Sequence, residues 1–206
     1  MTSTDADRTL AEETFAERAR LADLLAGLAP QEWGQDSLCR GWHVREVVSH
    51  LTMPFVISPA RFAAGLLRAG LRFDRFADRW ARADTRVTPD ARLLARLRDN
   101  QRHPWRPPGG GQAGALSHDV IHGLDVTEPL GLPAPPPQRI ALVLRHATDR
   151  QLRHFGVDLA GLRLLDPQTG VSIGDGRPVT MPAKDLLLVV TGRRPVPAPD
   201  PEHGRP

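Results

Sequence analysis

Two histidines, His118 and His122, stand four residues apart in the segment LSHDVIHGLDV. On a helix, both imidazoles would lie on one face about a turn apart, and this spacing lets them chelate one divalent metal ion. Asp125 continues the same stripe three residues further on. The spacing by itself has little specificity, because it lacks the glutamate of the HExxH motif and occurs in many helices that bind no metal.

His50 is the natural third ligand, because it lies at the edge of an apolar stripe on a separate expected helix, within GWHVREVVSHL. Three neutral imidazoles would leave coordination positions open, which is typical of catalytic zinc sites and not of structural ones. Asp125 either orients His122 through its second ring nitrogen or is simply a polar residue near a helix end. The residue types therefore predict a metal site formed by His50, His118 and His122, with Asp125 behind it.

The elements that must position these residues are helices in the first part of the chain. Apolar residues at three- and four-residue spacings, with Ser-Pro and Thr-Pro start signals, predict helices over about residues 7–28, 43–54, 59–83, 89–102 and 115–128. Pro54 should kink or break the second of them, because it lacks the N–H that would bond the carbonyl of His50. The stretch HPWRPPGGGQAG, residues 103–114, is expected to be a loop.

The chain changes character after the proline-rich stretch LGLPAPPPQ, which is the best candidate for a domain boundary. Beyond it we expect one more helix that ends near Gly156, a small β meander from Leu162, and a short terminal helix with Gly192 as its C-cap. The predicted organisation is a metal-binding helix bundle over 7–130, a small α+β region over 138–194 and a disordered tail over 195–206.

Composition describes an ordinary globular chain of 206 residues, 40% hydrophobic and 25% charged. No window approaches the roughly 18 apolar residues of a membrane span, and the polar, acidic start is unlike a secretory signal, so we expect a cytoplasmic protein. The single cysteine, Cys39, excludes a disulfide framework. The net charge is only +3, so the isoelectric point of about 10.2 does not indicate a strongly basic protein. It reflects the absence of tyrosine and the near absence of lysine, which leave few groups that titrate between histidine and arginine.

The segments GWHVREVVSHL, SHDVIHGLDV and GRPVTMPAKDLLLVVTGRR together resemble the DinB-like, mycothiol-dependent maleylpyruvate isomerase family. The resemblance covers about residues 10–193. It implies a mainly α fold, a DinB-like four-helix bundle with a small C-terminal α+β appendage. It further implies a divalent metal, most often zinc, bound at His50, His118 and His122, with mycothiol as the thiol cosubstrate. In the isomerase itself a glutamate stands at the position of His118. A neutral imidazole there would leave the metal more positive and favour a bound thiolate.

Arginines recur along the expected helix over residues 59–83, opposite its aromatic residues. This stripe is typical of a membrane or nucleic-acid surface, but also of an ordinary solvated face, and we favour the solvated face. We therefore predict no nucleic-acid or membrane partner, and a monomer or homodimer. Arg102, Trp105 and Arg106 in the loop before the ligand-bearing helix are candidate cofactor-binding residues, and Arg61 is a further candidate to hold a substrate carboxylate.

These observations favour a metal-dependent enzyme that transfers mycothiol to a small electrophilic substrate, or isomerises such a substrate with the help of mycothiol. No cysteine is expected at a candidate site, because Cys39 lies in an expected loop and is interpreted as incidental. The thiol should therefore arrive with the cofactor. Two alternatives remain. In a zinc hydrolase the metal would activate water, and in a non-catalytic binding or stress-response module the metal would be structural or absent.

Overall fold

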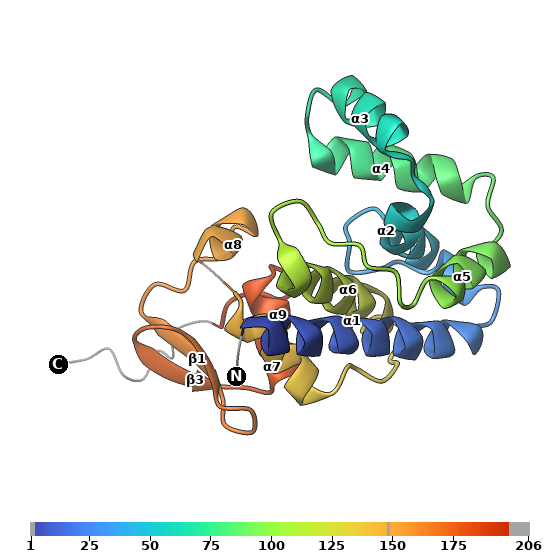
Figure 1. Cartoon of the computed structure of the whole chain (residues 1–206). Coiled ribbons are helices and arrows are strands. Elements are labelled where there is room, and N and C mark those ends of the chain that lie inside the picture. Colours follow the sequence, from blue (N-terminus) through green and yellow to red (C-terminus); the bar gives the residue numbers. More distant parts are fainter. Residues whose placement is uncertain (1–2, 148, 198–206) are drawn as a thin grey trace. The chain divides into compact units, whose positions relative to one another are not determined.

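The computed structural model describes residues 3–147 and 149–197 and divides the chain into two compact units, Met1–Pro135 and Pro136–Pro206 (Figure 1). The expected tail from residue 198 onward lies outside the described residues. The first unit is helical. Its elements are α1 (Ser3–Ala26), a 3-10 turn (Glu32–Gly34), α2 (Val44–Val56), α3 (Pro59–Arg68), α4 (Phe73–Thr85), α5 (Asp90–Asp99) and α6 (Gly111–Thr127).

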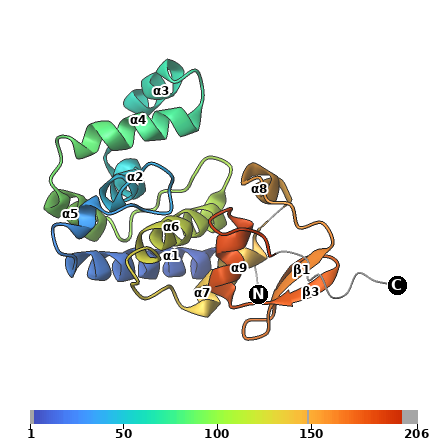
Figure 2. The same ribbon diagram turned by 180° about the vertical axis from the view of Figure 1, so that it is seen from behind.

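Four helices, α1, α2, α5 and α6, form the core of the first unit. Helix α1 lies beside α6 and α5, and α2 packs against α5 and α6 (Figures 1 and 2). Their apolar faces meet in one buried cluster that includes Leu21, Leu25, Val47, Leu51 and Leu97. The expected mainly α helical bundle is therefore confirmed, and burial of these faces is what stabilises helices of this length.

The single helix predicted over residues 59–83 is wrong, because the chain turns between α3 and α4. Gly70 at φ 68° and Leu71 at φ 61° adopt left-handed conformations, which no continuous α-helix contains. The apolar spacing continues across the turn and hides it in the sequence. The arginines expected on one stripe are therefore divided between two helices, of which α4 packs against α2.

Two other boundaries differ from the prediction. Helix α2 continues through Pro54 to Val56, so the proline does not end it. Pro54 lacks the N–H that would bond the carbonyl of His50, and the helix ends two residues later, at Val56. Helix α6 begins at Gly111, inside the segment expected to be a loop.

The second unit contains α7 (Pro137–Arg145), α8 (Asp149–His154), β1 (Leu162–Asp166), β2 (Val171–Gly174), β3 (Arg177–Thr180) and α9 (Ala183–Val190). The helix expected to end near Gly156 is thus two helices. The strands do not form a meander: β1 is central, antiparallel to β2 and parallel to β3. Gly192, at φ 69°, follows the terminal helix as expected.

Among the described residues, no helix has the length and apolar character needed to cross a membrane.

Candidate metal centre

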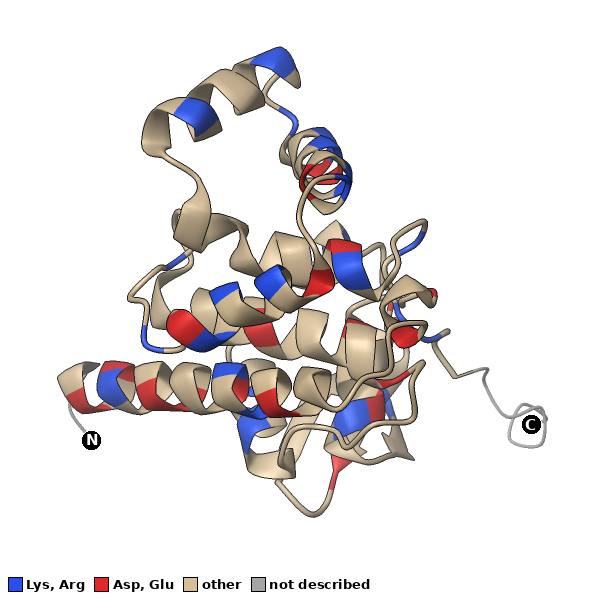
Figure 3. Ribbon diagram, turned by 90° about the vertical axis from the view of Figure 1, so that its right-hand side faces the viewer, with Lys and Arg blue, Asp and Glu red and all other residues tan. Residues whose placement is uncertain are grey.

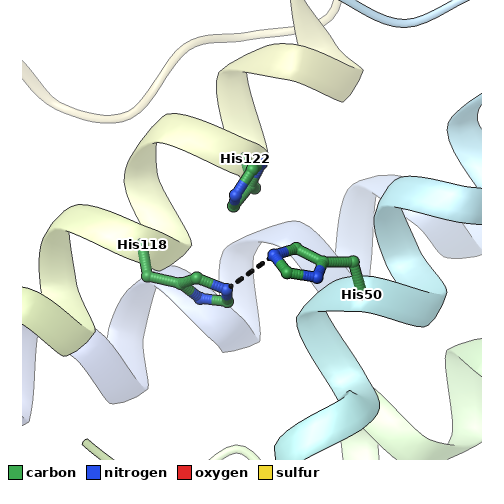
Figure 4. Close-up of side chains that lie close together, drawn as sticks. All are labelled: His50, His118 and His122. Carbon is green, nitrogen blue, oxygen red and sulfur yellow. Dashed lines mark hydrogen bonds between the residues drawn. The ribbon is translucent and has the colours of Figure 1, made fainter. Parts of the chain in front are cut away.

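The three predicted histidines converge between two helices of the first unit. His50 comes from α2, and His118 and His122 come from successive turns of α6 (Figure 4). The Nε2 atoms of His50 and His118 are 3.3 Å apart, and each residue offers a nitrogen within 4.8 Å of the others. Two nitrogens bound to one tetrahedral zinc ion are also separated by about 3.3 Å, since each bond is about 2.0–2.1 Å. The cluster therefore fits a metal ion.

Local packing explains why these rings face one another. His50 follows the buried residues Val47 and Val48 on α2, and only 5% of its surface is exposed. His118 and His122 are half-buried, because their stripe of α6 lies at the edge of the bundle. The side of the cluster formed by His118 and His122 is therefore partly exposed, while the side of His50 is closed by the core.

A carboxylate stands behind each histidine of α6. His118 Nδ1 lies 2.8 Å from Asp119 Oδ1, and His122 Nδ1 lies 2.9 Å from Asp125 Oδ2. A carboxylate accepts a hydrogen bond, so each Nδ1 carries the proton and each Nε2 keeps its lone pair. This is the tautomer that a metal ligand needs.

Asp119 is itself held by Arg18 of α1, and neither residue was singled out from the sequence. Arg18 Nε donates to Asp119 Oδ2 at 2.6 Å, and the two side chains are only 2% and 5% exposed. Arg18 Nη1 also donates to the carbonyl of His103 at 2.7 Å, in the segment before α6. One buried guanidinium thus connects α1, this segment and the carboxylate behind His118.

His50 is oriented differently, by rings and not by a carboxylate. The ring centroids of Trp42 and Phe73 lie 5.3 Å and 6.3 Å from that of His50. Burial, and then the nearby imidazoles of His122 and His118, hold the pKa of His50 well below its usual value, against an opposing effect of Asp125. His50 is therefore neutral near pH 7, with a lone pair available to a metal. Its buried Nδ1 has no hydrogen-bond partner among the described residues.

Cys39 lies close to the site, although its expected loop position had suggested that it would be remote. Its Sγ donates to Asp125 Oδ2 at 3.0 Å and lies 3.6 Å from His122 Nδ1. The loop folds back onto α6, because the N–H of Leu38 bonds the carbonyl of Asp125 at 3.0 Å. The expectation that no cysteine lies near a candidate site is therefore wrong. Cys39, His122 and Asp125 form a second group close enough to hold a metal ion.

The three candidate cofactor-binding residues have different surroundings. The ring of Trp105 lies 5.1 Å from that of His118, edge to face, so Trp105 borders the histidine cluster. The guanidinium of Arg102 lies over the ring of Phe15 on α1, 5.3 Å from its centroid. Arg106 is exposed. Their role in binding a cofactor stays a prediction.

The described residues define a helical bundle with a cluster of three histidines between two of its helices. The chain belongs to the mycothiol maleylpyruvate isomerase family, because the family model described as the mycothiol maleylpyruvate isomerase N-terminal domain matches residues 14–127, more than half of its 206 residues. The match spans α2 and α6, and with them all three histidines.

Comparison with solved structures found the mycothiol-dependent maleylpyruvate isomerase, at 15% sequence identity and a TM-score of 0.47. A histidine-to-alanine mutant of that enzyme matches at 16% identity and a TM-score of 0.46. Both matches cover 94% of this chain and 90% of the other. No protein of curated function matches the chain.

Proposed function

We propose that this protein is a metal-dependent enzyme that acts on a small electrophilic substrate. It would either transfer mycothiol to that substrate or isomerise the substrate with the help of mycothiol. The observation that carries the proposal is the convergence of three imidazoles with nitrogens within 4.8 Å of one another. Membership of the mycothiol maleylpyruvate isomerase family supports the choice of thiol. His50, His118 and His122 would hold the metal, for which zinc suits an all-imidazole set.

When bound, a divalent metal would lower the pKa of a coordinated thiol and keep the sulfur as a thiolate near pH 7. The chain's own residues prepare the site for that ion. Asp119 and Asp125 hold the protons at Nδ1 of His118 and His122, so that both Nε2 atoms face inward as lone pairs. Burial keeps His50 neutral. Three neutral ligands leave most of the charge of the ion uncompensated, which favours an anionic sulfur over a neutral one.

The position of Cys39 supports a thiol that comes from outside the chain. Its Sγ contacts the Nδ1 side of His122, where Asp125 also binds, and not the side that would face the metal. Cys39 is the only cysteine of the chain. A sulfur at the open side of the cluster would therefore belong to a small-molecule thiol.

Trp105 beside His118, with Arg102 and Arg106 near it in sequence, would border the place where thiol and substrate meet. Arginine suits a substrate that carries a carboxylate. We further propose a cytoplasmic location, where a low-molecular-weight thiol is available, and a monomer or homodimer.

The experiment has two stages. Protein purified without a nickel column should contain one equivalent of divalent metal, which His118→Ala should lose while keeping its helical circular dichroism. Turnover of maleylpyruvate and of a panel of small electrophiles is then measured with and without mycothiol. Turnover only with mycothiol is expected. Equal turnover without thiol would assign a hydrolase, and a metal-free wild type of unchanged stability would contradict the site.

A further inference from the structure

A groove runs between α3 and α4, away from the histidine cluster. Its volume is about 680 Å³, within the range of roughly 300–1,000 Å³ that holds small organic ligands. The residues that line it include Arg61 and Arg68 of α3, and Arg79 and Trp80 of α4. The lining residues include none of the three clustered histidines and none of their hydrogen-bond or ring partners named above.

Small residues and aromatic rings make the hollow. Gly65 allows α3 to approach α4, because a Cβ there would lie 2.4 Å from Cε2 of Phe76. The ring of Phe76 packs edge to face on Phe62 at 5.2 Å and lies 6.4 Å from the ring of Trp80. The groove therefore has an aromatic wall that an apolar ligand body can contact.

The rim of the groove is positively charged. Helix α3 carries Arg61 and Arg68 two turns apart and contains no acidic residue (Figure 3). Among the described residues, no carboxylate lies within ion-pairing distance of Arg61, Arg68 or Arg79. Arg79 donates only to the carbonyl of Arg68, at 3.1 Å. Three guanidiniums thus surround one hollow without a matching acid from the chain.

The acidic residue that lines the groove, Asp84, is already engaged. It accepts hydrogen bonds from Ser49 at 2.7 Å, from Arg96 at 2.6 Å and from Thr88 at 2.9 Å. Burial would raise the pKa of Asp84, but these bonds outweigh it and the pKa lies below its usual value. Asp84 therefore faces α2 and α5 and leaves the arginines uncompensated.

Trp80 is half-buried and lines the same groove. Its indole Nε1 is buried and has no hydrogen-bond partner among the described residues. Because that nitrogen is not exposed, the contribution of Trp80 to binding would come from its ring.

We propose that the groove between α3 and α4 binds a small organic acid, with its carboxylate held by Arg61, Arg68 and Arg79 and its apolar body against Phe76 and Trp80. The guanidinium fork matches a carboxylate in both geometry and charge. This site is separate from the proposed metal centre and does not depend on the function proposed for it.

The test is calorimetric titration of the full-length protein with 4-phenylbutyrate, which combines a carboxylate with an aromatic body. The neutral 4-phenylbutanamide is the ligand control. We expect saturable binding of one equivalent of the acid, and binding of the amide at least about tenfold weaker, since it loses the charge-assisted hydrogen bonds. No saturable binding of the acid, or equal binding of acid and amide, would overturn the proposal.

Variants locate the site. Arg68→Gln and Trp80→Phe should each weaken binding several-fold, whereas Arg75→Gln, an exposed arginine of α4 outside the groove, should leave it unchanged. Trp80→Phe keeps most of the ring and removes only the N–H donor and the second ring. Equal loss in Arg75→Gln and Arg68→Gln would instead indicate nonspecific attraction to the basic face. Binding of phosphatidylglycerol vesicles that the acid does not displace would lead to the same conclusion of nonspecific attraction and would likewise overturn the proposal.

Discussion

The buried ion pair between Arg18 and Asp119 leads to the sharpest prediction, made with Asp119→Asn. Its side chains are 2% and 5% exposed, and Asp119 contacts both Arg18 Nε at 2.6 Å and His118 Nδ1 at 2.8 Å. The amide that replaces the carboxylate cannot compensate the guanidinium, so a buried charge is left alone. Removing one partner of such a pair costs about 3–5 kcal/mol. The metal-free variant should be less stable by this amount.

The same substitution should weaken metal binding separately. An amide no longer holds the proton of His118 at Nδ1 as firmly, and loss of such a partner typically lowers metal affinity about 10–100-fold. In the double variant Arg18→Met/Asp119→Asn, no unpaired charge remains, so stability should recover in part. Metal affinity should stay low, because His118 still lacks its carboxylate. This difference separates a positioning role from a purely structural one.

Urea unfolding of the chelator-treated protein measures the stability, and competition with a chromophoric chelator measures the affinity. Asp5→Asn is the matched control, since Asp5 forms an exposed ion pair with Arg8 and should change neither quantity measurably. An Asp119→Asn variant within about 1 kcal/mol of the wild type would refute the ion-pair argument. Unchanged metal affinity would refute the role of Asp119 behind His118.

Three further predictions follow from single contacts. Burial and the neighbouring imidazoles lower the pKa of His50 in the folded protein. As the pH falls, His50 therefore binds a proton in the unfolded chain before it does so in the folded protein. The metal-free protein should therefore lose stability as the pH falls below about 6.5, and His50→Gln should flatten this slope in urea unfolding between about pH 8 and pH 5.5. Cys39→Ser keeps a donor to Asp125 and should hold metal affinity within about threefold, whereas Asp125→Asn should lower it by about 10–100-fold; similar losses in both would contradict this. Gly65→Ala places a Cβ 2.4 Å from Phe76 and should destabilise the α3–α4 pair by about 1–3 kcal/mol, seen as faster proteolysis there, whereas Gly34→Ala, with open space around it, should not.

Local patterns in the sequence predict most of the helices, because a buried face imposes its spacing on the residues that form it. The same patterns fail where a turn preserves that spacing. Apolar residues continue from α3 into α4, so the turn at Gly70 and Leu71 leaves only a weak trace. The prediction of a β meander was wrong for another reason. Strand patterns contain no information on strand order, so the pairing of β1 with β3 could not be predicted from them.

Some residues of the candidate site could likewise be predicted from local patterns, and others could not. His118, His122 and Asp125 share one helix, so their spacing brings them to one face. Arg18 and Asp119 are 101 residues apart, and only the packing of α1 against α6 joins them. Cys39 reaches Asp125 through a loop that is joined to α6 by a backbone hydrogen bond from Leu38. No local pattern marks such contacts.

Cobalt substitution tests the central claim most directly, namely that three histidines hold an ion at which an external thiol binds. Addition of mycothiol to the cobalt-loaded protein should produce a thiolate-to-cobalt absorption band. The band should persist in Cys39→Ser and be absent in His118→Ala. A wild type that shows no new band with mycothiol would contradict the account. So would a band present before mycothiol is added and abolished by Cys39→Ser, because the sulfur would then be the protein's own.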